Sequence, residues 1–316
     1  MRLLAPRNWA ILMNSQVRNF TLALGLLITS IATGHEGCVI GLNSNSSVLP
    51  LNVNTMFLSQ LQMMRFNYSD PNLGYGNPVE FDQIYTSNSG MRWQHHPFLA
   101  STISIPLKTS YRQTKNYGDF TTGMGDINVQ FEYFDKHFVK DSTLIGLFRS
   151  SVAFSLPTGN FKRKGPDRIQ LPIALQPGTG SWSQSIAISY TLMGANSGFS
   201  STINIMRFST NKQFYQLGNQ LFARISRLNK FEYDNSMLLI DGGFSLLMAG
   251  KDHQYGITLP NTSEVQCNAS LKGVLSKGKY ALQGELALPI FQTAKNVGGR
   301  LKYQASIGLT YLFGDS

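Results

Sequence analysis

The sequence has little charge, and after its N-terminal segment it has no hydrophobic run long enough for a membrane-spanning helix. Only 14% of its 316 residues are Asp, Glu, Lys or Arg, against roughly 25% in a typical soluble domain. A spanning helix needs a run of about 18 apolar residues, and none is present in the expected mature chain. These two absences together favour a transmembrane β-barrel, which turns its polar side chains toward its own lumen.

Cysteine is also scarce, with two in the chain. Cys267 falls in an expected strand, on the lipid side, where it would act as a small apolar group. Cys38 falls in the N-terminal tail. A disulfide between them is compatible with an oxidising periplasm, but the expected distance between strand and tail disfavours it. Lipidation of Cys38 is disfavoured as well, because His35-Glu36-Gly37 in front of it lacks the small and aliphatic residues of a lipobox.

Several kinds of functional site are also missing. No run of Lys and Arg is interleaved with aromatics, so nucleic acid is not an expected partner. His95-His96 and His137 fall in short turns, and no serine is placed to pair with His253 and its neighbour Asp252. We therefore expect no catalytic residue, no metal site and no cofactor.

The N-terminus indicates export. Arg18 precedes an apolar run over residues 20–31, and Ala32-Thr33-Gly34 is a small-x-small cleavage site. This pattern is typical of a Sec-type signal peptide, with Met13 as an alternative start to Met1. We expect a signal peptide at 1–34, a periplasmic N-terminal tail at 35–54 and a barrel at 55–316. Loss of Arg2, Arg7 and Arg18 would lower the formal charge from +10 by 3, to +7.

The segment 301–313 carries the clearest strand pattern. Its odd-numbered positions from Tyr303 to Phe313 are apolar or aromatic, and its even-numbered positions are mostly polar or small. Because side chains alternate along a strand, one face is apolar and the other polar. Aromatics near both ends with aliphatics between them suit a strand that faces lipid. By itself the segment fits a sandwich strand equally well.

The rest of the chain favours the barrel. Twelve candidate strands occur, at 55–66, 81–94, 97–107, 126–135, 143–156, 181–193, 198–208, 217–227, 236–248, 264–275, 279–290 and 301–313. Short and long connections alternate between them, as periplasmic turns and extracellular loops do in bacterial barrels. The expected fold is all-β, a transmembrane antiparallel up-and-down β-barrel of about twelve strands with both ends in the periplasm.

Three short glycine motifs stand out. Gly123-Met124-Gly125-Asp126 opens the fourth strand, Leu156-Pro157-Thr158-Gly159 closes the fifth, and Gly178-Thr179-Gly180 leads into the sixth. The first motif is not a phosphate loop, because no Lys follows and the next segment alternates like a strand. A glycine and a carboxylate that shape a loop end explain it better.

In this order and spacing, the three motifs resemble those of an outer-membrane transporter family named for the meta-pathway of phenol degradation. The resemblance is clearest over residues 85–195. It implies a barrel that passes small solutes, including aromatic or apolar ones. The chain departs from the usual barrel ending, since Gly314-Asp315-Ser316 follow Phe313.

The sequence thus predicts an outer-membrane channel or transporter that works by passive diffusion, with a non-conducting adhesive or structural barrel as the alternative. Expected partners are outer-membrane lipids, the barrel-assembly machinery and a small-molecule solute. Charged side chains on the expected lumen face would set selectivity, or would pair into a plug. The alternation places seven of them there: Glu132, Arg149, Arg224, Asp241, Lys272, Glu285 and Lys302.

Overall fold

The structure is a computed structural model. It describes residues 55–68, 79–115, 118–139, 144–165, 170–234, 236–260, 262–293 and 299–313. The expected signal peptide, the N-terminal tail with Cys38, and residues 314–316 lie outside these ranges. No helix within the described ranges is long and apolar enough to cross a membrane.

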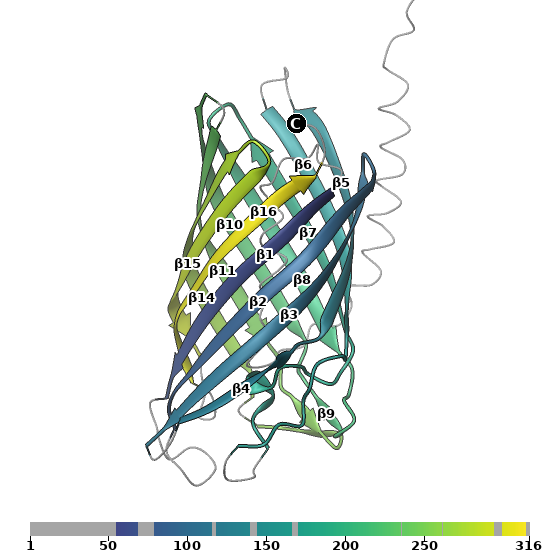
Figure 1. Cartoon of the computed structure of the whole chain (residues 1–316), viewed down its shortest axis with the longest axis vertical. Helices are drawn as coiled ribbons and strands as arrows, with labels where there is room; N and C mark the ends of the chain where they lie inside the picture. The colour runs from purple at the N-terminus through teal and green to yellow at the C-terminus, as the bar shows by residue number, and fades with distance from the viewer. Residues whose placement is uncertain are drawn as a thin grey trace, which may run out of the picture. The chain divides into compact units, whose positions relative to one another are not determined.

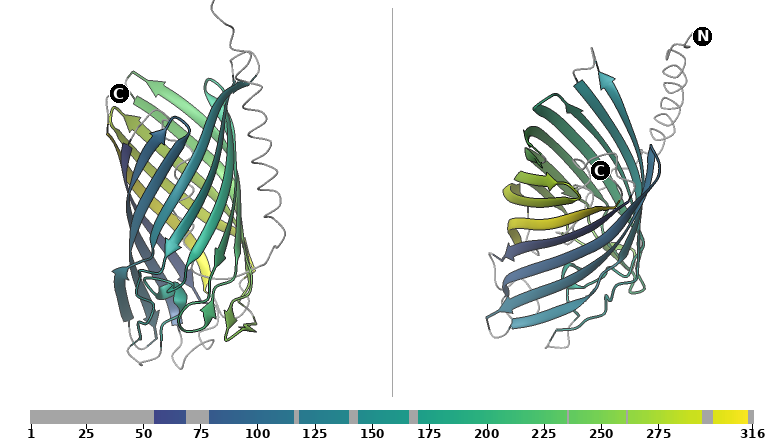
Figure 2. Two further views of the ribbon diagram at one scale, coloured as in Figure 1. Left: turned by 90° about the vertical axis from the view of Figure 1, so that its right-hand side faces the viewer. Right: turned by 45° about the horizontal axis from the view of Figure 1, so that its top comes forward.

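The described chain forms a closed antiparallel barrel of twelve strands (Figures 1 and 2). One of the twelve is made of two segments, β4 and β5, which pair in turn with β3. The strands are β1 (Thr55–Asn67), β2 (Val79–His96), β3 (Leu99–Thr114), β4 (Gly118–Met124), β5 (Ile127–Val139), β6 (Leu144–Leu156), β7 (Ser183–Met193), β8 (Ser197–Phe208), β10 (Gln220–Tyr233), β11 (Ser236–Ala249), β14 (Glu264–Lys277), β15 (Tyr280–Gln292) and β16 (Arg300–Phe313). All twelve expected strands are confirmed, with some of their ends displaced.

The barrel closes where its first and last strands meet. β1 pairs with β16 from Thr55 opposite Phe313 to Asn67 opposite Arg300, and on its other edge it pairs with β2. Every other barrel strand pairs with its neighbours in the chain, so the topology is up-and-down. Closure pairs both edges of the first and last strands of the described barrel, which a sheet in lipid requires.

The expected strands at 97–107 and 126–135 leave residues 108–125 as a long loop between them, and this part of the prediction is wrong. β3 and β4 continue as a paired hairpin through most of it, from Leu107 opposite Met124 to Gln113 opposite Gly118. These residues are mostly Thr, Ser, Tyr, Gln and charged residues, so hydrophobic alternation gave no indication of a strand. Their ladder is made by backbone groups and does not depend on apolar side chains.

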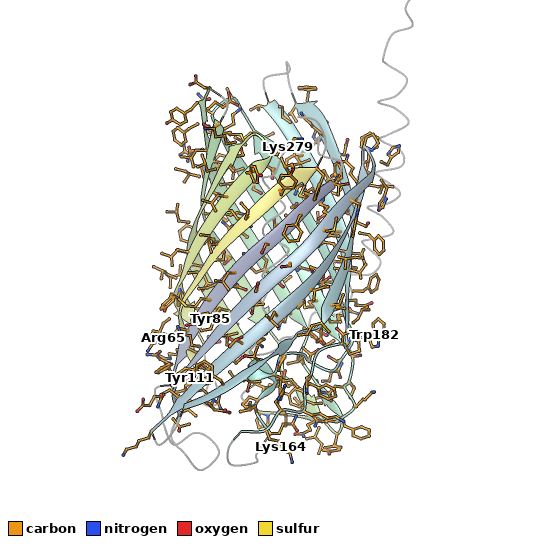
Figure 3. The ribbon with its side chains drawn as sticks, viewed as in Figure 1. Arg65, Tyr85, Tyr111, Lys164, Trp182 and Lys279 are labelled. Carbon is orange, nitrogen blue, oxygen red and sulfur yellow. The ribbon has the colours of Figure 1, made fainter. Side chains whose placement is uncertain are left out.

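Long and short connections lie at opposite ends of the barrel, as expected from their alternation. Figure 3 shows Lys279, in the turn between β14 and β15, at one end, and Lys164 and Trp182 at the other. We call the latter the loop end. Two of its loops contribute a small sheet of β9 (Tyr215–Gln216), β12 (His253–Gln254) and β13 (Ile257–Thr258).

The outer wall of the barrel is apolar. Large side chains are exposed on successive outward positions, and Ile203 in the middle of β8 is 55% exposed. The same is true on the other strands for Leu61, Ile103, Phe131, Phe199, Ile225, Phe244, Leu271, Leu286, Ile307 and Leu309. Near the end opposite the loop end, the rings of Tyr280, Tyr311 and Phe313 pack together. An apolar wall with aromatics toward its edge is the surface of a transmembrane barrel in the outer membrane.

The inner wall is mostly polar. Buried polar side chains follow the inward positions of nearly every strand: Gln60, Gln62, Thr86, Asn88, Ser104, Asn204, Ser245, Asn268, Gln283 and Thr310. Toward the end opposite the loop end, apolar Leu228, Leu239, Val274 and Ala281 form a buried cluster. The first strand turns Met56, Gln60, Gln62 and Met64 inward.

A charge on the outer wall should destabilise the barrel. Ile203→Lys is expected to lower the free energy of unfolding by about 2–4 kcal/mol, the cost of a lysine at the bilayer midplane. Ile203→Val is the control, with a cost of about 0.5–1.5 kcal/mol. Urea unfolding in liposomes, followed by heat-modifiable migration on gels, measures both. Equal stability of the lysine variant and the wild type would mean that this wall does not face lipid.

Candidate functional site

The three glycine motifs, separate in the sequence, meet at one point at the loop end. Asp126 lies at the break between β4 and β5. Its Oδ1 accepts a hydrogen bond from the backbone N–H of Gly159 at 2.8 Å. Its Oδ2 accepts from the backbone N–H and from the hydroxyl of Thr179, both at 2.7 Å. One carboxylate therefore ties the start of β5 to both ends of the long loop 157–182, which joins β6 to β7.

Glycine is needed here because two backbone segments pass too close together for side chains. A Cβ at Gly159 would lie 2.6 Å from the Cα of Gly178, and a Cβ at Gly178 would lie 2.7 Å from Asp126 Oδ1. Both distances are below 3.0 Å, so any larger residue would push the loop ends apart. The glycines thus let the loop ends reach the carboxylate.

The remaining motif residues complete the junction. The Thr158 hydroxyl accepts from the backbone N–H of Ile127 at 2.9 Å and donates to the carbonyl of Gly125 at 3.3 Å. Gly180 has a φ of +69°, and a Cβ there would meet the ring of Phe161. The others flank these contacts: Gly123 lies against Pro177, and the carbonyl of Leu156, next to Pro157, accepts from the Thr158 N–H at 2.7 Å.

Beyond this junction the loop is bonded to itself. Gln176 is 1% exposed, and its Oε1 accepts from the backbone N–H of Arg163 at 3.0 Å. Its Nε2 donates to the carbonyls of Arg163 and Leu171, both at 2.9 Å. The carbonyl of Asn160 accepts from the N–H of Gly178 at 3.0 Å. The described part of the loop is therefore an internally bonded unit with a defined shape.

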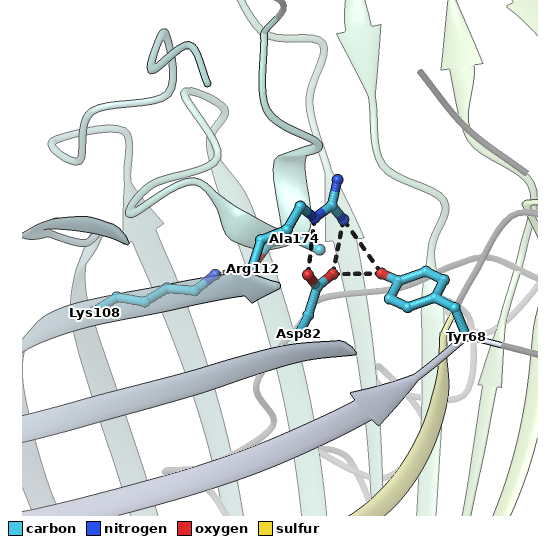
Figure 4. A network of polar contacts seen from close by, with 5 residues as sticks. All are labelled: Tyr68, Asp82, Lys108, Arg112 and Ala174. Carbon is cyan, nitrogen blue, oxygen red and sulfur yellow. Dashed lines mark hydrogen bonds and ion pairs between the residues drawn. The ribbon is translucent and has the colours of Figure 1, made fainter. Parts of the chain in front are cut away.

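This unit places a short 3-10 helix, η2 (Ile173–Leu175), against the inner wall. Leu175 is 2% exposed and packs with Met64 of β1, Ile84 of β2 and Leu301 of β16. Lys108 of β3 donates from its Nζ to the carbonyl of Ala174 (Figure 4). The loop thus enters the barrel at its mouth and narrows the lumen there.

A second polar network lies beside η2 (Figure 4). Arg112 of β3 binds the Asp82 carboxylate of β2 through two nitrogens, with Nε 2.8 Å from Oδ1 and one terminal nitrogen 2.7 Å from Oδ2. The hydroxyl of Tyr68 donates to the same carboxylate. A bidentate pair fixes the orientation of both side chains, so the strands below η2 are held together.

Deeper in the barrel, four of the predicted lumen residues form one charged group, which we call the quartet. Arg224 of β10 binds Asp241 of β11 at 3.0 Å and Glu285 of β15 at 2.9 Å. Lys272 of β14 is directly opposite Asp241 on one neighbouring strand and Glu285 on the other. The quartet contains two cations and two carboxylates, so its charges balance.

Another charged group lies across the barrel and contains two further predicted residues. Arg92 of β2 donates from Nε to Glu132 of β5 at 2.9 Å. Arg149 of β6 lies two strand positions from Ser151, the residue opposite Glu132. We call Arg92, Glu132 and Arg149 the trio. Its two cations and one carboxylate leave a formal charge of +1.

Lys302 is the exception among the seven predicted lumen residues. The pairing of β1 with β16 shifts by one residue between Arg65 and Phe66. This irregularity reverses the alternation at the start of β16, so Leu301 is buried against Met64 and Lys302 is exposed. Lys302 therefore belongs to neither charged group, although strict alternation had pointed it inward.

The sequence did not predict that the charged residues Asp82, Arg92, Lys108 and Arg112 lie on the inner wall. The alternation of the first three strands is hard to recognise in the sequence, because their inward positions mix apolar with polar residues, such as Ile84 between Asp82 and Thr86. The even spacing of Asp82 and Arg92, ten residues apart on β2, was the available indication that both face the same way.

Three of the four described histidines, His95, His137 and His253, contact hydroxyl groups, and the ring of His96 packs against Phe98. His95 Nε2 lies 2.6 Å from Ser101 Oγ, and His253 Nδ1 lies 3.1 Å from Thr258 Oγ1. Within the described ranges, no three His, Cys, Asp or Glu side chains are grouped so as to hold a metal ion. Cys267 is a half-buried free thiol.

No family model and no curated protein matches this sequence. Among solved structures, the chain is similar to the COG4313 outer membrane channel from Pseudomonas putida F1, with 15% identity over 85% of this chain and 98% of that one, and a TM-score of 0.65. It also aligns with the CymD monoaromatic hydrocarbon channel (8% identity, 90% and 95% covered, TM-score 0.41). The translocator domain of the autotransporter NalP from Neisseria meningitidis aligns comparably (10% identity, 86% and 91% covered, TM-score 0.42). At 15% identity, the similarity to the COG4313 channel shows a shared fold. The other two TM-scores are below 0.5, so we draw no conclusion from those alignments.

Removal of the Asp126 carboxylate should release the loop. Asp126→Ala deletes three charge-assisted hydrogen bonds, each worth about 1.5–3 kcal/mol, so opening of loop 157–182 should become at least tenfold more frequent, with about 1.4 kcal/mol per factor of ten. Trypsin cleavage after Lys162, Arg163 or Lys164 in the folded barrel measures this opening.

The matched control is Glu232→Ala, which removes a carboxylate that is 67% exposed on β10, away from the loop. Trypsin should cleave loop 157–182 in this control variant at the same rate as in the wild type. If Asp126→Ala were cleaved no faster than the control, the carboxylate would not hold the loop.

Proposed function

We propose that this chain is an outer-membrane channel that lets small polar solutes diffuse through its lumen. One observation carries the proposal: the inward positions of nearly every strand carry polar side chains, among them Gln62, Thr86, Asn88 and Asn204. In a dry interior each unpaired polar group would cost about 1–3 kcal/mol. A polar inner wall is what a water-filled path requires, and small solutes diffuse along such a path.

The fold shared with the COG4313 channel supports the same function. That protein is described as an outer membrane channel, and its barrel aligns with this one over 98% of its length. The motif resemblance implied aromatic or apolar solutes among those transported. The polar inner wall and its two charged groups favour small polar or ionic solutes instead.

The alternative is a barrel that conducts nothing, with a structural or adhesive role. The quartet supports it, because the Arg224, Asp241 and Glu285 side chains are only 10%, 4% and 11% exposed. Charges buried and paired in this way can fill a lumen as well as line it. The channel and the non-conducting barrel differ in whether a change in the charge of the quartet alters the ion selectivity of a current.

Loss of the two quartet cations should change ion selectivity. In Arg224→Gln with Lys272→Gln, the carboxylates of Asp241 and Glu285 keep their charge, so the lumen should shift toward cations. The complementary double variant, Asp241→Asn with Glu285→Gln, should shift toward anions. The measurement is the reversal potential in planar bilayers with a potassium chloride gradient.

The control replaces all four side chains with the neutral residues above, which keeps the charge balance of the wild type. It should have nearly the wild-type reversal potential. Each double variant leaves buried charges unpaired, at a cost of about 3–5 kcal/mol, so folding is checked by heat-modifiable migration. If folded double variants move the reversal potential in the same direction, or not at all, the quartet does not line a conducting path.

A further inference from the structure

The positive charges of the lumen are unequally compensated. The quartet is balanced, since Arg224 binds both carboxylates and Lys272 lies between them in the sheet. The trio has one carboxylate for two arginines. Together they hold four cations and three carboxylates, an excess of one positive charge. The excess therefore lies in the trio, on the β6 side of the lumen.

Within the trio, Glu132 is already engaged. Its Oε2 accepts from Arg92 Nε at 2.9 Å, and its Oε1 accepts from Gln130 Nε2 at 3.0 Å. Arg149 is two strand positions away, since the partner of Glu132 on β6 is Ser151. The Nε of Arg149 has no hydrogen-bond partner in the described protein. It is the arginine whose donor remains to be satisfied.

Arg149 has to share the single carboxylate of the trio. Glu132 already accepts a hydrogen bond from Arg92 at 2.9 Å, and its partner position on β6 is Ser151, two residues from Arg149. A buried guanidinium donor without an acceptor is unfavourable, and a neighbouring like charge adds to the cost.

We propose that Arg149 is an anion-binding subsite in the lumen, specific for a small anion that accepts a hydrogen bond, such as a carboxylate. The anion would accept from Nε and complete the pairing that the trio lacks. A planar carboxylate matches the guanidinium geometry, which binds two oxygens side by side. Arg149 is partly exposed while its Nε lies below the surface, so the guanidinium would turn toward the lumen to present Nε to the anion.

The subsite rests on the proposed function in one respect, since it assumes that solutes enter the lumen. It adds a class of solute and a residue that recognises it. The other two arginines of the charged groups do not offer the same site, because Arg224 and Arg92 have their carboxylate partners within 3.0 Å.

The test measures binding separately from conduction. Purified barrel is titrated with sodium acetate in low-salt buffer, and its unfolding temperature is followed by heat-modifiable migration. A ligand of the folded state raises this temperature in a saturable way. Arg149→Gln should abolish the saturable rise. Arg149→Lys keeps the charge but loses the fork of donors, so half-saturation should need about tenfold more acetate, the loss of about one charge-assisted hydrogen bond.

Lys302→Gln is the matched control, because it removes one positive charge at an exposed position outside both groups. It should keep the wild-type response. If Arg149→Gln does not fold, Arg149→Lys alone decides the question. An acetate response equal in wild type and every Arg149 variant overturns the subsite.

Conduction is then recorded on the same preparations. Saturable binding without conductance would leave the subsite standing and overturn the channel. Conductance without Arg149-dependent binding would leave the channel standing and overturn the subsite.

Discussion

Closure of the sheet between β1 and β16 is the constraint on which the rest of the structure depends. In lipid no water can satisfy backbone N–H and C=O groups, so every strand must pair on both edges. The ladder from Thr55–Phe313 to Asn67–Arg300 supplies the last of these pairings. Once the sheet is closed, each side chain faces either lipid or the lumen. Charged side chains of the spanning strands then have an inner side to occupy, as Arg224, Asp241 and Glu285 do.

The fold was predictable because this two-sided environment imposes a period of two on the sequence. Twelve strands, the up-and-down order and the alternation of short and long connections were all readable from it. The register was harder to predict. A one-residue irregularity beside Arg65 exchanges Leu301 and Lys302 between the walls, and nothing in the local sequence marks that shift. The hairpin of β3 and β4 was missed for a different reason, since its polar side chains carry no hydrophobic period.

The candidate site was predictable as a set of residues but not as an arrangement. The three glycine motifs were recognisable, yet their contact depends on three loop ends meeting in space. Asp126 receives Gly159 and Thr179 from positions 33 and 53 residues further along the chain. The lumen charges were assigned one strand at a time, and their pairing depends on the register between strands. Arg224 reaches Asp241 and Glu285 because the closed sheet brings β10, β11 and β15 around one level of the lumen.

The barrel therefore has two features that would control passage: a loop that is bonded to its rim and inserts Leu175 at the mouth, and a charged level below it. Both are fixed by hydrogen bonds to carboxylates, Asp126 in one case and Asp241 with Glu285 in the other. A lumen narrowed in this way would suit the diffusion of small polar or ionic solutes that we propose.

Single-channel recording of the unmodified chain in planar bilayers tests the channel most directly. Insertion is verified independently by heat-modifiable migration of the same preparation. We predict discrete current steps of small, uniform size, as expected for a narrow lumen. Verified insertion at many barrels per membrane without any current step would contradict the channel and favour a structural barrel.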